Sequence, residues 1–157
     1  MVSADPDGGF SKRSIRYYEE RAKGGVGLII TGYSAESTKY EKAPCNVLDD
    51  VDKVARAHEL VQRVHMHGAK ICMQLGPGLG NIFYLDDKTP PYSSCEEVES
   101  FWFKGLKCKA LTKEDIKFIV NAVGYSASLA KQAEADAVEL RVYGRLLGRP
   151  VYVYKVE

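Results

Sequence analysis

The sequence has 157 residues, of which 45% are hydrophobic and 27% are charged, and its formal net charge is +1. This length and composition fit one soluble globular domain and exclude a disordered chain. A near-neutral charge without a basic cluster argues against nucleic-acid and anionic-membrane partners, and no apolar run approaches the roughly 20 residues of a membrane span.

The N-terminus shows no basic segment followed by an apolar one, which is the mark of a signal peptide. The 4 cysteines lie far apart in the sequence and show no spacing typical of metal ligands. We therefore expect reduced thiols, no bound metal and a cytoplasmic protein.

The first predicted unit is a helix followed by a strand. Ser11 can cap a helix over about 12–23, which Gly24 and Gly25 end. Residues 26–31 form a short apolar run bounded by glycine, which predicts a strand buried on both faces. The inner face of this helix would consist of Ile15, Tyr18 and Ala22.

The second unit repeats this order. Asp49 and Asp50 place negative charge at a helix start, and Gly68 suits the helix end. A strand over 69–75 follows. Apolar and histidine residues at three- and four-residue spacing predict the inner stripe of the helix, made of Val51, Val54, His58, Leu60, Val61, Val64 and His65.

The third unit begins after a long irregular stretch, 76–110, which is a candidate lid or substrate loop. Thr112 and Asp115 resemble a capping box at a helix start. A strand over 137–143 comes next, and an alternating run over 151–154 predicts a further short strand. The apolar face of the third helix would consist of Ile116, Ile119, Val120, Val123, Ala127, Ala130 and Ala133.

The resulting order α-β-α-β-α-β predicts an α/β fold with parallel strands and right-handed crossovers. In such folds the chemistry lies at the carboxyl ends of the strands. Those ends are 31–33, 74–76 and 141–143.

Four segments resemble the Old Yellow Enzyme-type NADH:flavin oxidoreductases, a group that includes 2,4-dienoyl-CoA reductase-like enzymes. The most specific is RYYEERAKGGVGLIIT over 16–31, which resembles the family's first helix and second strand. Segments 67–75, 109–116 and 135–140 resemble the third strand, the start of the third helix and the fourth strand. The resemblance covers about 8–147.

The resemblance implies a (β/α)8 TIM barrel that holds FMN, accepts hydride from NADH or NADPH, and reduces the activated C=C bond of a small unsaturated carbonyl or enoyl substrate. By position, Gly32 and Tyr33 would flank the flavin ring, and Gln74 would bond its pyrimidine edge. An amide suits that edge because it offers both a donor and an acceptor. Arg141 and Tyr143 would be the catalytic residues beside the substrate carbonyl.

Two departures from the family pattern change these expectations. Arg141 stands where the family usually has histidine; it stays charged and cannot act as an acid, although it can hold an oxyanion. Tyr143 keeps a hydroxyl that can donate a proton. The tail also diverges, so we predict a partial flavin-binding barrel over 1–147 and a divergent tail over 148–157.

A closed barrel needs about 250 residues. We therefore predict a truncated chain, a partial (β/α)8 TIM barrel of about three βα units with parallel strands. Open parallel edges favour a homo-oligomer or a complementing chain. Two other functions stay open: a non-catalytic barrel fragment that self-associates through its sheet edges, and a small doubly wound nucleotide-binding domain.

Three further motifs have ordinary explanations. The glycine-rich segment 76–80 follows a strand but no helix opens after it, so a dinucleotide-binding loop is unsupported. The histidines indicate core packing and last-turn charge rather than a metal site. The aromatic run 101–103 either lines a substrate mouth or pins the long loop to the body.

Overall fold

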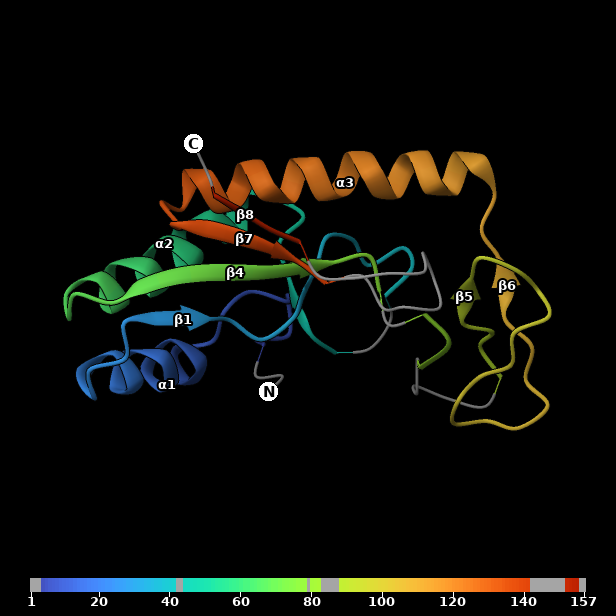
Figure 1. Ribbon diagram of the computed structural model, residues 1–157, viewed down its shortest axis with the longest axis horizontal. Coiled ribbons are helices and arrows are strands. Elements are labelled where there is room, and N and C mark those ends of the chain that lie inside the picture. The colour runs from blue at the N-terminus through green and yellow to red at the C-terminus, as the bar shows by residue number, and fades with distance from the viewer. Residues whose placement is uncertain (1–3, 42–43, 79, 83–87, 142–151, 156–157) are drawn as a thin grey trace.

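The computed structural model describes residues 4–41, 44–78, 80–82, 88–141 and 152–155 (Figure 1). Its helices are α1 (Lys12–Lys23), α2 (Val54–His65) and α3 (Lys113–Gln132), with short 3-10 turns η1 (Val51–Lys53) and η2 (Gly80–Ile82). Its strands are β1 (Leu28–Ile30), β2 (Ser34–Ala35), β3 (Asn46–Val47), β4 (Lys70–Gly76), β5 (Tyr92–Ser93), β6 (Lys109–Ala110), β7 (Ala137–Leu140) and β8 (Tyr152–Lys155).

The main sheet is organised around β4. On one side of β4, its first half pairs with β1 and its last residues pair with β2, while β7 pairs along the other side. All three pairings are parallel, which confirms the predicted strand direction. The short strand β3 extends the sheet beyond β2.

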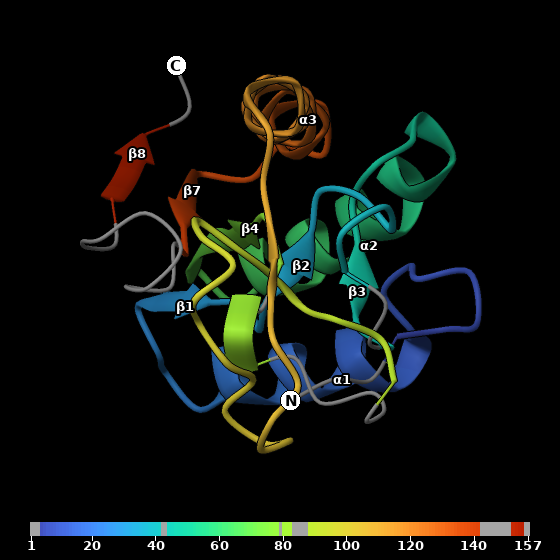
Figure 2. The ribbon, with the colours of Figure 1, turned by 90° about the vertical axis from the view of Figure 1, so that its right-hand side faces the viewer.

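The tail adds β8 to the outer edge of β7, in antiparallel orientation. This confirms the short strand predicted near 151–154. Figure 2 shows α1, α2 and α3 arranged around one side of the sheet, and within the described residues the strands form an open sheet and not a closed barrel. A doubly wound domain would have helices on both faces, so that alternative is wrong.

The hydrophobic core lies between the sheet and its helices. Alternation along each strand sends one set of side chains towards the helices and the next set to the opposite face. The expectation that 26–31 is buried on both faces is wrong, because Leu28 and Ile30 are 54% and 46% exposed. The strand residues that face the helices are Ile29, Ile71, Met73, Leu75 and Val138.

Local signals set the helix ends as predicted. The Ser11 hydroxyl accepts a hydrogen bond from the Ser14 N–H at 3.1 Å, and Gly24 ends α1. Thr112 and Asp115 form a complete capping box at the start of α3. No helix in the described part of the chain is long and apolar enough to cross a membrane.

The predicted inner stripe of α2 needs correction. Val51 is exposed because η1 is a 3-10 turn, whose tighter winding puts it out of phase with the helix that follows. His58 and His65 lie at the margin of the buried stripe and face carboxylates, with His65 Nε2 only 2.7 Å from the Asp136 carboxylate. The buried α2 residues are Ala57, Leu60, Val61 and Val64.

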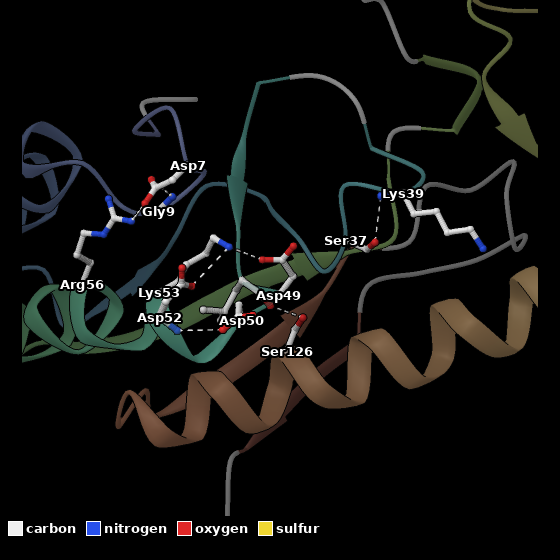
Figure 3. A network of polar contacts seen from close by, with 11 residues as sticks. Asp7, Gly9, Ser37, Lys39, Asp49, Asp50, Asp52, Lys53, Arg56 and Ser126 are labelled. Carbon is white, nitrogen blue, oxygen red and sulfur yellow. Dashed lines mark hydrogen bonds and ion pairs between the residues drawn. The ribbon is translucent and has the colours of Figure 1, made fainter.

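The predicted apolar face of α3 is correct for Ile119 and for the second half of the helix. Ile116 and Val120 are exposed, because the N-terminal half of α3 extends past the end of the main sheet (Figure 1). Further along the helix, the buried Ser126 hydroxyl donates to the Leu48 carbonyl at 2.5 Å (Figure 3). The second half is therefore the part that anchors α3 to the body.

The long stretch 76–110 is not wholly irregular. Its middle (β5) and its last residues (β6) pair in a small parallel sheet, placed beyond the carboxyl ends of the main strands (Figure 1). Phe101 and Trp102 are exposed and contact each other edge-to-face at 5.0 Å. Neither aromatic side chain is buried against the body.

Candidate functional site

Three polar side chains meet at the carboxyl ends of β4 and β7. Gln74 Nε2 donates to Glu139 Oε1 at 2.8 Å, and an Arg141 guanidinium nitrogen donates to Gln74 Oε1 at 3.2 Å. The strand register places Gln74 beside Glu139, on the sheet face opposite the helices. The Gln74 amide is thus oriented from both of its ends.

The backbone of Gln74 is held from the break between β1 and β2. Its N–H donates to the Thr31 hydroxyl at 3.0 Å, and the Thr31 N–H donates to the Cys72 carbonyl at 2.9 Å. A side chain therefore supplies the hydrogen bond that a continuous neighbouring strand would otherwise give.

Gly32 and Tyr33 follow at the same end of the sheet. The Gly32 N–H donates to the Tyr18 hydroxyl of α1 at 2.7 Å. The Tyr33 hydroxyl donates to the Gly76 carbonyl at 3.0 Å. Burial raises the pKa of Tyr33, and the nearby carboxylates of Glu41 and Glu36 raise it further, so this phenol stays protonated at neutral pH.

Gly76 is packed tightly between two of these residues. A Cβ atom there would lie 2.6 Å from the Arg141 carbonyl oxygen and 2.8 Å from Cε2 of Tyr33. The absence of a side chain at Gly76 therefore lets the Tyr33 ring and the Arg141 backbone both pack closely against the end of β4.

The predicted site residues that the structure describes, Gly32, Tyr33, Gln74 and Arg141, are thus brought to one end of the sheet, and Gln74 and Arg141 are in direct contact. Tyr143 lies outside the described residues. Sequence reasoning missed Glu139 as a member of the group. A charged residue inside the apolar segment 137–143 was the available signal, since its register opposite Gln74 follows from parallel pairing.

Two buried acids lie beyond β2. Glu36 is 3% exposed and Glu41 is 2% exposed. Burial raises the pKa of Glu36 to about 8, and the charge of Glu41 adds to this rise. Glu36 Oε2, Ser34 Oγ and Asn46 Oδ1 are buried without a hydrogen-bond partner among the described residues.

The described residues hold no cluster of His, Cys, Asp or Glu side chains that could bind a metal ion. Burial raises the pKa of Cys45 to about 12 and that of Cys72 to about 11. Both cysteines are therefore protonated, weakly reactive thiols at neutral pH.

A cavity of about 360 Å³ lies beside the end of β4. Pro77 and Gly78, which directly follow β4, form part of its wall, and Tyr40 and Tyr92 form another part. The aromatic pair Phe101 and Trp102 is not among the described residues that line it.

Comparison with known proteins gives a consistent result. Residues 1–147 match the NADH:flavin oxidoreductase / NADH oxidase family. A protein from Clostridium sporogenes named cinnamate reductase is 37% identical over 139 residues, which cover 85% of this chain and 21% of that protein. A protein from Thermoanaerobacter brockii named NADH oxidase is 34% identical over 156 residues, covering 93% of this chain and 23% of that protein.

Comparison with solved structures agrees with the sequence comparison. The crystal structure of Old Yellow Enzyme from Pichia sp. AKU4542 superposes with a TM-score of 0.72 at 22% identity, covering 87% of this chain and 38% of that one. This confirms the α/β fold of a partial TIM barrel. The chain spans about a fifth of the length of the two relatives named above.

Proposed function

Because the chain belongs to the NADH:flavin oxidoreductase / NADH oxidase family, we propose that it forms part of an FMN-dependent oxidoreductase that uses NADH or NADPH to reduce an activated C=C bond. The observation that carries this proposal is the Gln74 amide, fixed between Glu139 and Arg141 where β4 ends. The name of the Clostridium sporogenes relative, cinnamate reductase, supports an alkene conjugated to a carbonyl group as the substrate.

The residues at the strand ends fit an isoalloxazine ring edge. The Gln74 amide nitrogen carries two hydrogens and its oxygen has two lone pairs, so the bonds to Glu139 and Arg141 use half of its capacity. The remaining donor and acceptor match a ring edge on which these groups alternate.

Each residue has a distinct role in this proposal. Gln74 holds the ring edge, while Gly32 and Tyr33 border the ring. FMN, when bound, supplies the atom that accepts hydride from the nicotinamide and donates it to the substrate. Arg141 holds the substrate carbonyl oxygen through charge-assisted hydrogen bonds, and Tyr143 donates the proton to the substrate carbon.

FMN binding tests the proposal directly. We expect the purified chain to quench flavin fluorescence on titration with FMN, and Gln74→Ala to weaken binding by a factor of roughly 5 to 30, the worth of one buried hydrogen-bonding group. Gln62→Ala is the matched control, because Gln62 is exposed on α2 and its side chain bonds only Glu134 in the described contacts. The proposal would be contradicted if the chain did not bind FMN, or if Gln74→Ala and Gln62→Ala lost the same amount of FMN affinity.

Turnover tests the catalytic residues. In an assembly that reduces an unsaturated carbonyl compound with NADH or NADPH, we expect Tyr143→Phe to lower kcat by roughly 10²-fold or more, since it removes a general acid. FMN affinity should stay unchanged in this variant. A kcat equal to that of the unmodified chain would remove Tyr143 from the mechanism.

A second candidate function is a non-catalytic barrel fragment that associates with copies of itself or with a complementing chain. The exposure of Leu28 and Ile30 on the edge strand β1 favours it. Sedimentation of the chain over a range of concentrations tests this candidate, and a monomer at all concentrations would exclude self-association.

A further inference from the structure

The cavity beside the end of β4 combines aromatic walls with two amines. Its volume, about 360 Å³, is near the lower end for small-molecule sites and admits one small ligand. We propose that this cavity binds a small planar carboxylate with an aromatic or unsaturated apolar body. Its use as the substrate pocket rests on the proposed function; the binding itself does not.

The walls suit a flat, apolar ligand. The rings of Tyr40 and Tyr92 meet edge-to-face with centroids 5.0 Å apart, the geometry in which aromatic rings attract each other. Pro91, Leu111 and Ile119 supply further apolar surface. A third ring can enter this group with the same edge-to-face or offset contacts.

The charge of the lining favours an anion. The charged residues among the described lining are Lys39 and Lys109, and both are cationic. The Lys39 amine lies 4.8 Å from the centre of the Tyr40 ring, and the Lys109 amine lies 5.7 Å from that of Tyr92. Each amine is therefore next to an aromatic wall, where it can bind the carboxylate of a ligand whose ring packs on tyrosine.

The two lysines are not equivalent. The Lys39 amine also lies 3.5 Å from the Asp115 carboxylate, which neutralises part of its charge. No salt bridge to Lys109 occurs among the described residues. Lys109 should therefore contribute more than Lys39 to the affinity for an anion.

The cavity walls are held by hydrogen bonds and are connected to the candidate active site. The Tyr40 hydroxyl donates to Asp115 at 2.5 Å, and the Lys109 N–H donates to the Pro91 carbonyl at 2.8 Å. Pro77, which lines the cavity, directly follows Gly76, which packs against Tyr33 and the Arg141 carbonyl. The cavity therefore adjoins the strand end that carries the candidate site, although neither Gln74 nor Arg141 lines it.

Calorimetric titration of the chain without flavin or nicotinamide tests the proposal. The probes are trans-cinnamate and its uncharged counterpart, cinnamamide, which has the same size and flatness. We expect cinnamate to bind at least roughly tenfold more tightly, the contribution of one charge-assisted hydrogen bond. Lys109→Met should remove most of this preference and leave cinnamamide binding unchanged, whereas Lys109→Arg should preserve it.

Lys107→Met is the matched control, since Lys107 is exposed on the same segment but does not line the cavity. The proposal would be overturned if cinnamate and cinnamamide bound with equal affinity, or if neither bound. It would also be overturned if Lys107→Met and Lys109→Met lost the same amount of affinity for cinnamate. Flavin affinity is measured separately by fluorescence. A chain that binds cinnamate but not FMN would keep this inference and refute the proposed function.

Discussion

At the scale of single residues, Gly76 shows how closely the candidate site is packed. Its missing side chain leaves room for both the Tyr33 ring and the Arg141 carbonyl, and neither is the flexible end of a side chain. The Tyr33 ring is further fixed because its hydroxyl donates to the carbonyl of Gly76 itself. Any larger residue at position 76 must therefore displace backbone or a restrained ring.

We predict that Gly76→Ala lowers the free energy of unfolding by about 1 to 3 kcal/mol, the usual cost of overpacking. Gly124→Ala provides the contrast. A Cβ at Gly124, inside α3, meets nothing within 4 Å, so alanine should raise the free energy of unfolding by about 0.5 to 1 kcal/mol. Urea unfolding of the two variants measures both values, and a neutral Gly76→Ala would contradict the tight packing.

Glu36 predicts a pH dependence of stability. Its pKa is raised from 4.5 to about 8 in the folded chain, so between these values the folded state holds a proton that the unfolded state has released. Stability should then fall as pH rises through this window, by up to about 1.4 kcal/mol per pH unit. Above pH 8 the full cost of holding an ionised Glu36 in the folded chain is present.

Glu36→Gln should remove this slope and stabilise the chain at pH 8, because a neutral amide replaces a buried carboxyl group. The exposed Glu97→Gln is the control, and its profile should follow that of the unmodified chain. Urea unfolding at pH 5, 6.5 and 8 measures the slope. Parallel profiles for the Glu36→Gln and unmodified chains would show that Glu36 does not titrate in this window.

At the scale of elements, Asp136 joins three of them just before β7. Its carboxylate accepts from the Ile71 N–H at 2.9 Å, lies 2.7 Å from His65 Nε2 and pairs with the Lys70 amine at 2.8 Å. Burial disfavours its charge, but the hydrogen bonds from Lys70, His65 and Ile71 outweigh burial and lower the pKa of Asp136 to about 2. One carboxylate thereby connects α2, β4 and β7.

We predict that Asp136→Asn costs about 2 kcal/mol of stability at pH 7, as expected from its lowered pKa. A lowered pKa stabilises above the ordinary value of 3.8, and the contribution is lost as pH falls towards 2. The difference between variant and unmodified chain should therefore vanish in acid. Asp52→Asn, at a largely exposed carboxylate, should have little effect in the same thermal and urea measurements.

The elements that the sequence predicted well are those with strong local signals. Ser11 and Thr112 cap their helices through their own hydroxyls, and Gly25 and Gly68 adopt the left-handed backbone expected near helix ends. The two-residue strands β2 and β3 escaped prediction because their pairing depends on distant partners. The exposure of Ile116 and Val120 on α3 escaped prediction because periodicity cannot show where a sheet ends.

The candidate site was predictable in part for the same reason. Gln74 and Arg141 were expected at neighbouring strand ends, and parallel pairing brings them into contact. The cavity with Lys39 and Lys109 was not expected. Lys39 and Lys109 are about 70 residues apart in the sequence. They meet because the small β5–β6 sheet and the start of α3 fold back beside the end of β4.

At the scale of the whole molecule, the two edges of the sheet differ. β8 pairs with the outer edge of β7, whereas β1 is an edge strand that exposes Leu28 and Ile30. Large apolar side chains on an unpaired edge are a common site of association. The exposed edge is therefore where copies of this chain, or a complementing chain, should meet.

We predict that replacing Leu28 and Ile30 together with lysine abolishes concentration-dependent association in sedimentation experiments. Charged side chains on an edge strand oppose pairing with another strand. Val120→Lys serves as control, because Val120 is exposed to 64% on α3, away from the edge. If Val120→Lys reduced association to the same degree, the contact would not be specific to β1.

The break between β1 and β2 has a consequence for local opening. There the backbone N–H of Gln74 donates to the Thr31 hydroxyl and not to a carbonyl of a neighbouring strand. Thr31→Val keeps the side-chain shape but loses this acceptor. The backbone N–H of Gln74 should then exchange with deuterium far faster, while the backbone N–H groups nearer the start of β4 keep their protection. A single oxygen atom would then determine how often this part of the sheet opens locally.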